Sequence, residues 1–112
     1  GTGKTLAFGL PLLHHIDQTN KQVQALIVAP TRELVVQIAE SLQQVSKYTS
    51  IKITTIYGGV SMQDQLRVLK NDGVQVVVGT PGRLNDHLRR KTLKLTNLQT
   101  IVLDEADIML DM

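Results

Sequence analysis

The sequence predicts an α/β domain in which a parallel sheet is covered by helices on both faces. Short apolar runs alternate with segments of helical periodicity along the whole 112-residue chain. The runs are apolar throughout, which is typical of strands that are buried on both sides. Crossover connections between parallel strands then place helices on the two faces of the sheet. Because no internal repeat and no Gly/Ser/Pro linker divides the chain, we expect one domain, present here in incomplete form.

Each element has a local signal. Leu6, Leu10 and Leu13 recur at helical spacing and predict a first helix over 4–17, which Pro11 should bend. The elements that follow in chain order are a strand over 24–29, a helix over 34–45, a strand over 53–57, a helix started by Ser61 and Asp64, a strand over 74–78, a helix from Thr80 and Pro81 through Leu88, and a strand over 100–103.

Composition excludes several classes of protein. There is no cysteine, so a disulfide framework and thiolate metal sites are excluded. No apolar run approaches the roughly 18 residues that span a bilayer, and we expect a cytoplasmic setting without a membrane partner. The net charge of +2 is too small to indicate nucleic acid by itself, and an aromatic content of 3% offers no base-stacking platform. A nucleic-acid partner must therefore be argued from individual residues.

The first five residues resemble the second half of a phosphate-binding loop. In the pattern Gly-Thr-Gly-Lys-Thr, glycines allow backbone amides to approach phosphate, Lys4 reaches the terminal phosphates and Thr5 binds magnesium. At the other end of the chain, the apolar strand 100–103 runs into Asp104 and Glu105. One of these acids can hold the magnesium and the other can orient water. Together the two segments indicate a nucleoside triphosphatase.

Three further turns follow strands and precede helices. Thr31 and Thr80 are each placed to cap the next helix, with Arg32 or Arg83 in its first turn, and the turn 58–59 is a glycine pair. In an open parallel sheet such turns share the carboxyl edge, where helix N-termini attract anions. The alternative is a purely structural role, in which the threonines are ordinary helix caps and the arginines are solvated. All three turns together favour a polyanion backbone as the ligand.

Five segments resemble the motifs of the DEAD-box helicase family, in the family's order and spacing. They are Gly1 to Thr5, Pro30-Thr31-Arg32-Glu33-Leu34, Gly58-Gly59, Thr80-Pro81-Gly82-Arg83 and Asp104-Glu105-Ala106-Asp107. The sequence of residues 7–13 is similar to that of bacterial members of the family. The resemblance spans the chain and implies the first RecA-like domain of such a helicase, a three-layer P-loop NTPase fold. Residues 1–112 would be a partial ATP-binding domain that begins inside one motif and ends just past another, as amplification with primers aimed at those motifs would produce.

The resemblance implies a site for ATP and Mg²⁺. Glu105 would activate the attacking water, while Thr5 and Asp104 would bind magnesium, largely through water. The remaining nucleotide-binding positions would be Gly1, Thr2, Gly3, Lys4 and Asp107, with Lys4 and Asp104 also counted as catalytic. Adenine selectivity depends on an upstream motif that this sequence lacks.

The resemblance also implies an RNA surface. Its residues would be Pro30, Thr31, Arg32, Gly58, Gly59, Thr80, Gly82 and Arg83, mostly in contact with the sugar-phosphate backbone and therefore with little sequence specificity. The implied activity is ATP-dependent local unwinding of RNA, completed by a second RecA-like domain absent from this chain. That domain would supply arginines typically worth about 10³ to 10⁵ in rate, so the isolated piece is expected to be nearly inactive. RNA-processing or ribosome-assembly proteins are possible partners.

Two alternatives stay open at this point. An ATP-gated RNA clamp would use the same motifs without strand separation, and a DNA-stimulated P-loop ATPase would share the phosphate loop and the acids. Other residues that could suggest a metal site or a further RNA surface are given ordinary structural roles. His14, His15 and His87 are expected at the surface because none has a partner at metal-ligand spacing. The basic run 89–91 with Lys94 is expected to favour the helix dipole and solubility, although it could extend an RNA surface.

Overall fold

In the described part of the chain, the sheet has four parallel strands in the order β2-β3-β1-β4. The computed structural model describes residues 2–103, with the side chains of residue 7 and residues 9–103. The strands are β1 (Ala25–Val28), β2 (Ile53–Ile56), β3 (Val76–Gly79) and β4 (Thr100–Leu103). The two central strands, β1 and β3, are fully buried, whereas β2 and β4 lie at the two edges of the sheet.

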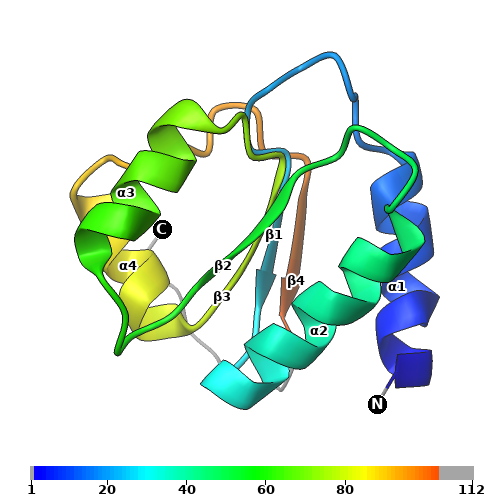
Figure 1. Ribbon diagram of the computed structural model, residues 1–112, viewed down its shortest axis with the longest axis horizontal. Coiled ribbons are helices and arrows are strands. Elements are labelled where there is room, and N and C mark those ends of the chain that lie inside the picture. The colour runs from blue at the N-terminus through cyan, green and yellow to red at the C-terminus, as the bar shows by residue number, and fades with distance from the viewer. Residues whose placement is uncertain (1, 104–112) are drawn as a thin grey trace.

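Within the described residues, four helices cover the sheet in two layers, as Figure 1 shows. Helices α1 (Thr2–His14) and α2 (Arg32–Val45) lie on one face, and α3 (Met62–Asn71) and α4 (Pro81–Arg89) lie on the other. The three layers confirm the predicted α/β class. None of the helices in the described part of the chain has the length and apolar content needed to cross a membrane.

Alternate residues of β1 build the two halves of the core. Ala25 and Ile27 pack with apolar side chains of α1 and α2, whereas Leu26 and Val28 pack on the side of α3 and α4. All four are 0% exposed. This period of two is that of a pleated strand, and burial on both sides explains why the run is apolar throughout.

Element boundaries differ from the sequence prediction mainly at the ends. Strand β4 occupies the predicted residues, while α1 ends at His14 and not at residue 17. Beyond it, the Asp17 carboxylate accepts hydrogen bonds from the backbone N–H and hydroxyl of Thr19, at 3.0 and 2.7 Å. These bonds lower the pKa of Asp17, the Thr19 hydroxyl contributing most. An aspartate bonded to the backbone two residues on forms a turn, which competes with further helix.

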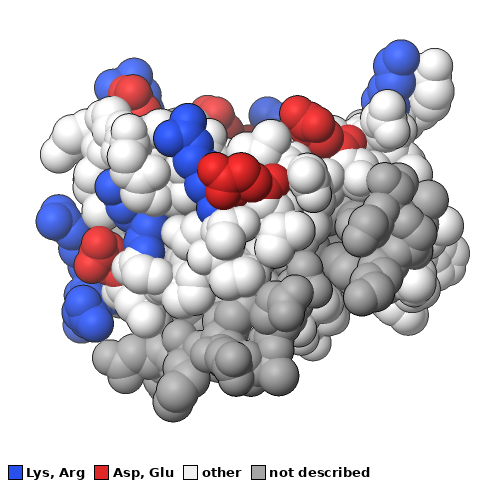
Figure 2. All heavy atoms as spheres, turned by 90° about the horizontal axis from the view of Figure 1, so that it is seen from below, with Lys and Arg blue, Asp and Glu red and all other residues white. Residues whose placement is uncertain are grey.

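The register aligns the ends of all four strands. Val28 pairs with Gly79 on one side and with Leu103 on the other, and Ile56 pairs with Gly79. Helices α2, α3 and α4 begin a few residues beyond these ends. We call this side of the sheet the carboxyl edge. It is the lower side in Figure 1, where α1 also begins, and Figure 2 looks directly onto it.

Candidate functional site

The start of α1 supplies the backbone of a phosphate site. Helix α1 begins at Thr2, so residues 2–5 form its first turn, at the carboxyl edge. The first backbone N–H groups of a helix lack internal partners and carry the positive end of the helix dipole, which suits phosphate. The donor set also fits magnesium-bound nucleotide, because an ammonium, a hydroxyl and carboxylates suit phosphate and Mg²⁺. The side chains of Lys4 and Thr5 lie outside the described residues.

The acidic half of the predicted nucleotide site follows β4. Leu103 is the last described residue, and it is aligned with the end of the central strand β1. Asp104, Glu105 and Asp107 come next in the sequence, and these residues, like Gly1, lie outside the described part of the chain. Their roles stay predictions. Within the described residues, no group of three or more His, Cys, Asp or Glu side chains could hold a metal ion.

Two arginines from different helices meet the glycine turn between β2 and α3. Gly59 has a φ of +86°, a left-handed conformation that favours glycine. A side-chain carbon at Gly59 would lie 3.6 Å from Arg32 Nη1, and one at Gly58 would lie 3.9 Å from Arg83 Nη2. The Arg32 guanidinium also stacks 4.8 Å above the centre of the Tyr57 ring. Three turns that the sequence placed at one edge thus come into contact there.

The orientation of Arg83 is fixed through one of its nitrogens. Arg83 Nη1 donates to the backbone carbonyl of Val60 at 3.1 Å and to Gln65 Oε1 at 3.0 Å. Within the described residues, its Nε and Nη2 make no hydrogen bond. Planar guanidinium groups bind carboxylate or phosphate through two parallel N–H groups. Arg83 is therefore held in place by Nη1 and keeps its other donors for an anion.

A buried polar network lies behind Arg83. Gln65 is 8% exposed, and its Nε2 donates to the Tyr57 carbonyl at 2.9 Å, which ties α3 to the glycine turn. Its Oε1 faces His87 Nε2 at 2.9 Å, and His87 Nδ1 lies 2.8 Å from the Thr92 hydroxyl. The network therefore connects the glycine turn, Arg83 and the segment beyond α4.

The prediction that His87 lies at the surface is wrong, since the side chain is 0% exposed. Both ring nitrogens have partners, which is what allows a histidine to be buried. The signal was present in the sequence, because Leu84, His87 and Leu88 share one face of α4 at spacings of three and four. Gln65 was missed in the same way, and it shares a helix face with Val68 and Leu69.

The network favours a neutral His87. Burial lowers the pKa of His87, and the positive charges of Arg83 and Arg90 lower it further. The amide of Gln65 is oriented so that its oxygen accepts from Arg83 and its nitrogen donates to Tyr57 O. That oxygen can only accept, so the ring hydrogen of neutral His87 lies on Nε2. His87 Nδ1 is then an acceptor for the Thr92 hydroxyl, whose single hydrogen can instead go to the His87 carbonyl at 3.1 Å.

Lowering the pH is expected to destabilise the domain through His87. An unfolded histidine titrates near a pKa of about 6.5, while native His87 takes up its proton only at lower pH. The stabilisation from its neutral form is therefore complete above about pH 6.5 and is lost as the pH falls through the native pKa. Urea unfolding at a series of pH values should show this decline, with a smaller slope in His87→Gln. The control is the double variant His14→Gln with His15→Gln, at two exposed positions. If it changed the slope as much as His87→Gln does, the pH dependence would not come from His87.

The two threonines differ in their capping. The Thr31 hydroxyl accepts from the backbone N–H of Leu34 at 3.2 Å, as expected of an N-cap. Thr80 occupies the N-cap position of α4, but its side chain makes no capping hydrogen bond, and that part of the prediction is wrong. Pro81 fixes where the helix starts without fixing the side-chain rotamer of Thr80. Within the described residues, the Thr80 hydroxyl makes no hydrogen bond.

The other predicted RNA-binding positions lie on the same edge. Pro30 and Gly82 are exposed, and a side-chain carbon at Gly82 would meet nothing within 4 Å. Figure 2 shows basic side chains on the side of α3 and α4, with acidic ones among them. The sign of the charges therefore does not mark out the described part of this face. The distinguishing feature is the glycine–arginine cluster, by which we mean Arg32, Gly58, Gly59 and Arg83.

The chain belongs to the DEAD/DEAH box helicase family, whose sequence model matches residues 1–112. It is 54% identical to the ATP-dependent RNA helicase CshA of Listeria monocytogenes and 52% identical to the DEAD-box ATP-dependent RNA helicase CshA of Bacillus cereus. Both alignments cover 100% of this chain and 21% of the relative. The chain thus spans about a fifth of the length of these relatives.

Solved structures agree with the family and the fold. A DEAD box protein of Methanococcus jannaschii is 43% identical, with a TM-score of 0.87, over 96% of this chain and 29% of that chain. Dbp5 of Saccharomyces cerevisiae, in a structure with RNA and ADP BeF3, is 40% identical, with a TM-score of 0.82, over 100% of this chain and 27% of that chain. These likenesses confirm the predicted resemblance and the RecA-like fold.

Proposed function

We propose that this chain is the ATP-binding, first RecA-like domain of an ATP-dependent RNA helicase. Membership of the family supports the proposal, as do the names of bacterial relatives that are ATP-dependent RNA helicases. Because the chain spans about a fifth of the length of those relatives, we assign to it only the ATP-binding part of the helicase. A second RecA-like domain of the complete protein would supply the arginines that finish the ATP site.

The nucleotide would bind at the start of α1. Bound ATP with Mg²⁺ supplies the phosphoryl group that is transferred to water. The backbone amides of residues 1–5 and Lys4 would bind the phosphates, and Thr5 and Asp104 would hold the metal, largely through water. Glu105 would accept the proton of the attacking water, and Asp107 would link this site to neighbouring motifs. The position of the α1 N-terminus at the carboxyl edge supports this assignment.

RNA would bind along the same edge, at the glycine–arginine cluster. One observation carries this proposal: Arg32 and Arg83, from two helices, are both held against one exposed glycine turn without an ion pair in the described residues. Exposed N–H groups of a glycine turn and arginine donors bind phosphate oxygens. The Thr80 hydroxyl and the N-termini of α2 and α4 would add contacts to the backbone. These groups read no base edges, so we expect little sequence preference.

Coupling between the two sites follows from their shared edge. ATP and RNA would both bind where the strands end, and closure of the second domain over this edge would bring the RNA contacts and the nucleotide together. We propose that closure distorts a short duplex and that hydrolysis reopens the domains. The Dbp5 structure with RNA and ADP BeF3 supports the combination of ligands in this family.

Removing both arginine charges is expected to weaken RNA binding by the complete protein. We predict that Arg32→Gln with Arg83→Gln lowers the affinity for single-stranded RNA at least tenfold, about 1.4 kcal/mol, because two phosphate contacts are lost. The slope of log affinity against log salt should fall by about 0.7 for each lost contact. Fluorescence anisotropy with a labelled oligouridine at several salt concentrations measures both quantities.

The matched control removes the same charge elsewhere. Lys47 and Lys52 are exposed and lie outside the glycine–arginine cluster, so Lys47→Gln with Lys52→Gln should leave affinity within about twofold. Equal losses in the two double variants would mean that only net charge matters, and the proposed RNA surface would be wrong.

A further inference from the structure

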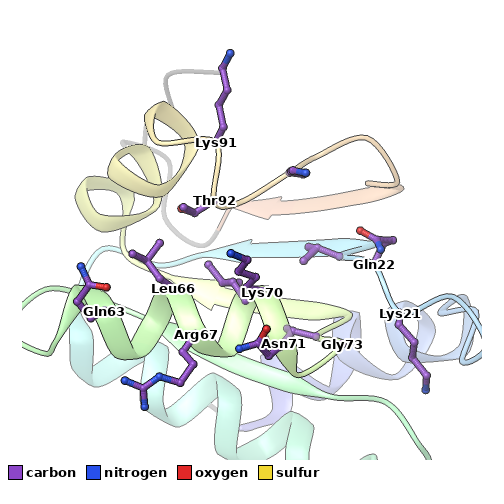
Figure 3. A pocket seen from close by; sticks show the side chains of 14 residues that line it. Lys21, Gln22, Gln63, Leu66, Arg67, Lys70, Asn71, Gly73, Lys91 and Thr92 are labelled. Atoms are coloured by element: carbon purple, nitrogen blue, oxygen red, sulfur yellow. The ribbon is translucent and has the colours of Figure 1, made fainter.

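A groove opens between α3 and the segment that follows α4 (Figure 3). Its volume of about 890 Å³ is in the range of ligand-binding cavities. Val23 and Val74 line it, and each lies two residues before the first residue of β1 or β3. The groove therefore extends along α3 to the edge where strands begin. None of its lining residues belongs to the proposed ATP or RNA contacts.

The groove concentrates positive charge. The chain has 12 Lys and Arg residues, and the groove is lined by five of them: Lys21, Arg67, Lys70, Lys91 and Lys94. None of the acidic residues in the described part of the chain lines it. Arg67 pairs with Asp64 at 3.2 Å, and Lys21 Nζ donates to the Gln18 carbonyl at 3.1 Å. Lys70, Lys91 and Lys94 have no ion pair within the described residues and can receive outside carboxylates.

Lys91 holds its position in an unfavourable backbone conformation. Its φ of 58° is the only left-handed value among the non-glycine residues that the structure describes. Lys91 follows the C-cap Arg90, at the position where helices usually carry glycine for this reason. The chain thus keeps a cationic side chain at the rim of the groove where glycine would relieve strain.

The groove also has an aliphatic wall. Leu66 and Leu69 of α3 line it together with Val23 and Val74, and none of the aromatic residues whose side chains are described does. Figure 3 shows Leu66 and Thr92 turned into the space, Lys70 beside it, and Lys91 and Lys21 extending outward on opposite sides. This aliphatic wall suits apolar side chains, which a sugar-phosphate backbone does not have, and the described lining residues include no aromatic ring on which bases could stack.

We propose that this groove binds an acidic segment of a partner protein. Aliphatic side chains of the segment would enter between α3 and residues 91–94, and its carboxylates would meet Lys70, Lys91 and Lys94. Opposite charge speeds association and fixes the register, while the apolar wall contributes affinity. A groove of this size buries less surface than a stable interface, so the complex is weak and exchanges rapidly.

The test uses the complete protein and a fluorescein-labelled peptide of about twelve residues that alternates glutamate with leucine. Lys70→Glu with Lys94→Glu is expected to weaken peptide binding at least tenfold, because two rim charges are reversed. The control Lys47→Glu with Lys52→Glu changes net charge equally at exposed positions outside the groove and should leave binding within about twofold. Unchanged thermal unfolding shows that both variants are folded.

Two further probes decide the chemistry of the occupant. A peptide alternating glutamate with serine should bind at least fivefold more weakly than the leucine peptide, since it cannot use the aliphatic wall. Equal binding of the two peptides, or equal losses in the two lysine variants, would overturn the proposal. An oligouridine that displaces the leucine peptide, and whose own affinity falls only in the Lys70 and Lys94 variant, would assign the groove to RNA and overturn it as well.

Discussion

Replacing Glu105 by glutamine is expected to lower RNA-stimulated ATP hydrolysis by the complete protein about 10² to 10⁴-fold. Glutamine keeps the size of the side chain but cannot accept the proton of the attacking water. The affinity for ATP should change little, because the phosphates would be bound by the first turn of α1 and Lys4. Steady-state hydrolysis and equilibrium binding of a fluorescent ATP analogue measure the two effects separately.

The separation between rate and affinity is the informative result. If Glu105→Gln kept kcat within about threefold, Glu105 would not be the general base. If the variant lost both hydrolysis and ATP affinity, the acid would contribute to holding the nucleotide and not to activating water. Lys4→Ala is the complementary variant, and it should lose ATP affinity because a phosphate partner is removed.

The second large effect is expected at Gly79, where β3 turns into α4. A side-chain carbon at Gly79 would lie 2.7 Å from the Ile56 carbonyl oxygen and 2.7 Å from Leu84 Cγ. The backbone around Gly79 cannot easily move, because Thr80 N donates to Ile56 O at 2.9 Å and Ala29 N donates to Gly79 O at 3.1 Å. Gly79→Ala should therefore lower the free energy of unfolding by about 1 to 3 kcal/mol, as overpacked cores do.

Gly82 provides the control for Gly79. A side-chain carbon at Gly82 would meet nothing within 4 Å, and the residue lies in the first turn of α4. Gly82→Ala should leave stability unchanged or raise it by up to about 1 kcal/mol, since alanine favours helix. Urea unfolding of the two variants gives the comparison. Equal stability of Gly79→Ala and the parent would mean that β2, β3 and α4 pack less tightly than the structure indicates.

The architecture could be predicted from local patterns. The apolar runs 24–29 and 74–78 are buried on both faces as β1 and β3, and their lack of alternation predicted this burial. Ser61 accepts a hydrogen bond from Asp64 N at 3.2 Å, in the capping position that the sequence indicated. Such signals arise within a few residues of each other, so a single sequence contains them.

The contacts behind the proposed RNA surface could not be predicted in the same way. The sequence placed Arg32, Arg83 and the glycine turn 58–59 at one edge, but not in contact with one another. Their contact depends on the register of β2 against β3 and on rotamers fixed by Gln65. Gln65 and Arg83 are 18 residues apart, and no local spacing relates them. The helix face of His87 indicates its burial, but its pairing with Gln65, 22 residues away, has no local signal.

The measurement that tests the central claim most directly is ATP hydrolysis by the complete protein with and without single-stranded RNA, with DNA as competitor. The account predicts strong stimulation by RNA, little competition by DNA, and loss of stimulation when Arg32 and Arg83 are both replaced by glutamine. Hydrolysis that is indifferent to RNA, or that DNA stimulates equally well, would contradict it and leave a P-loop ATPase without an RNA surface at the carboxyl edge.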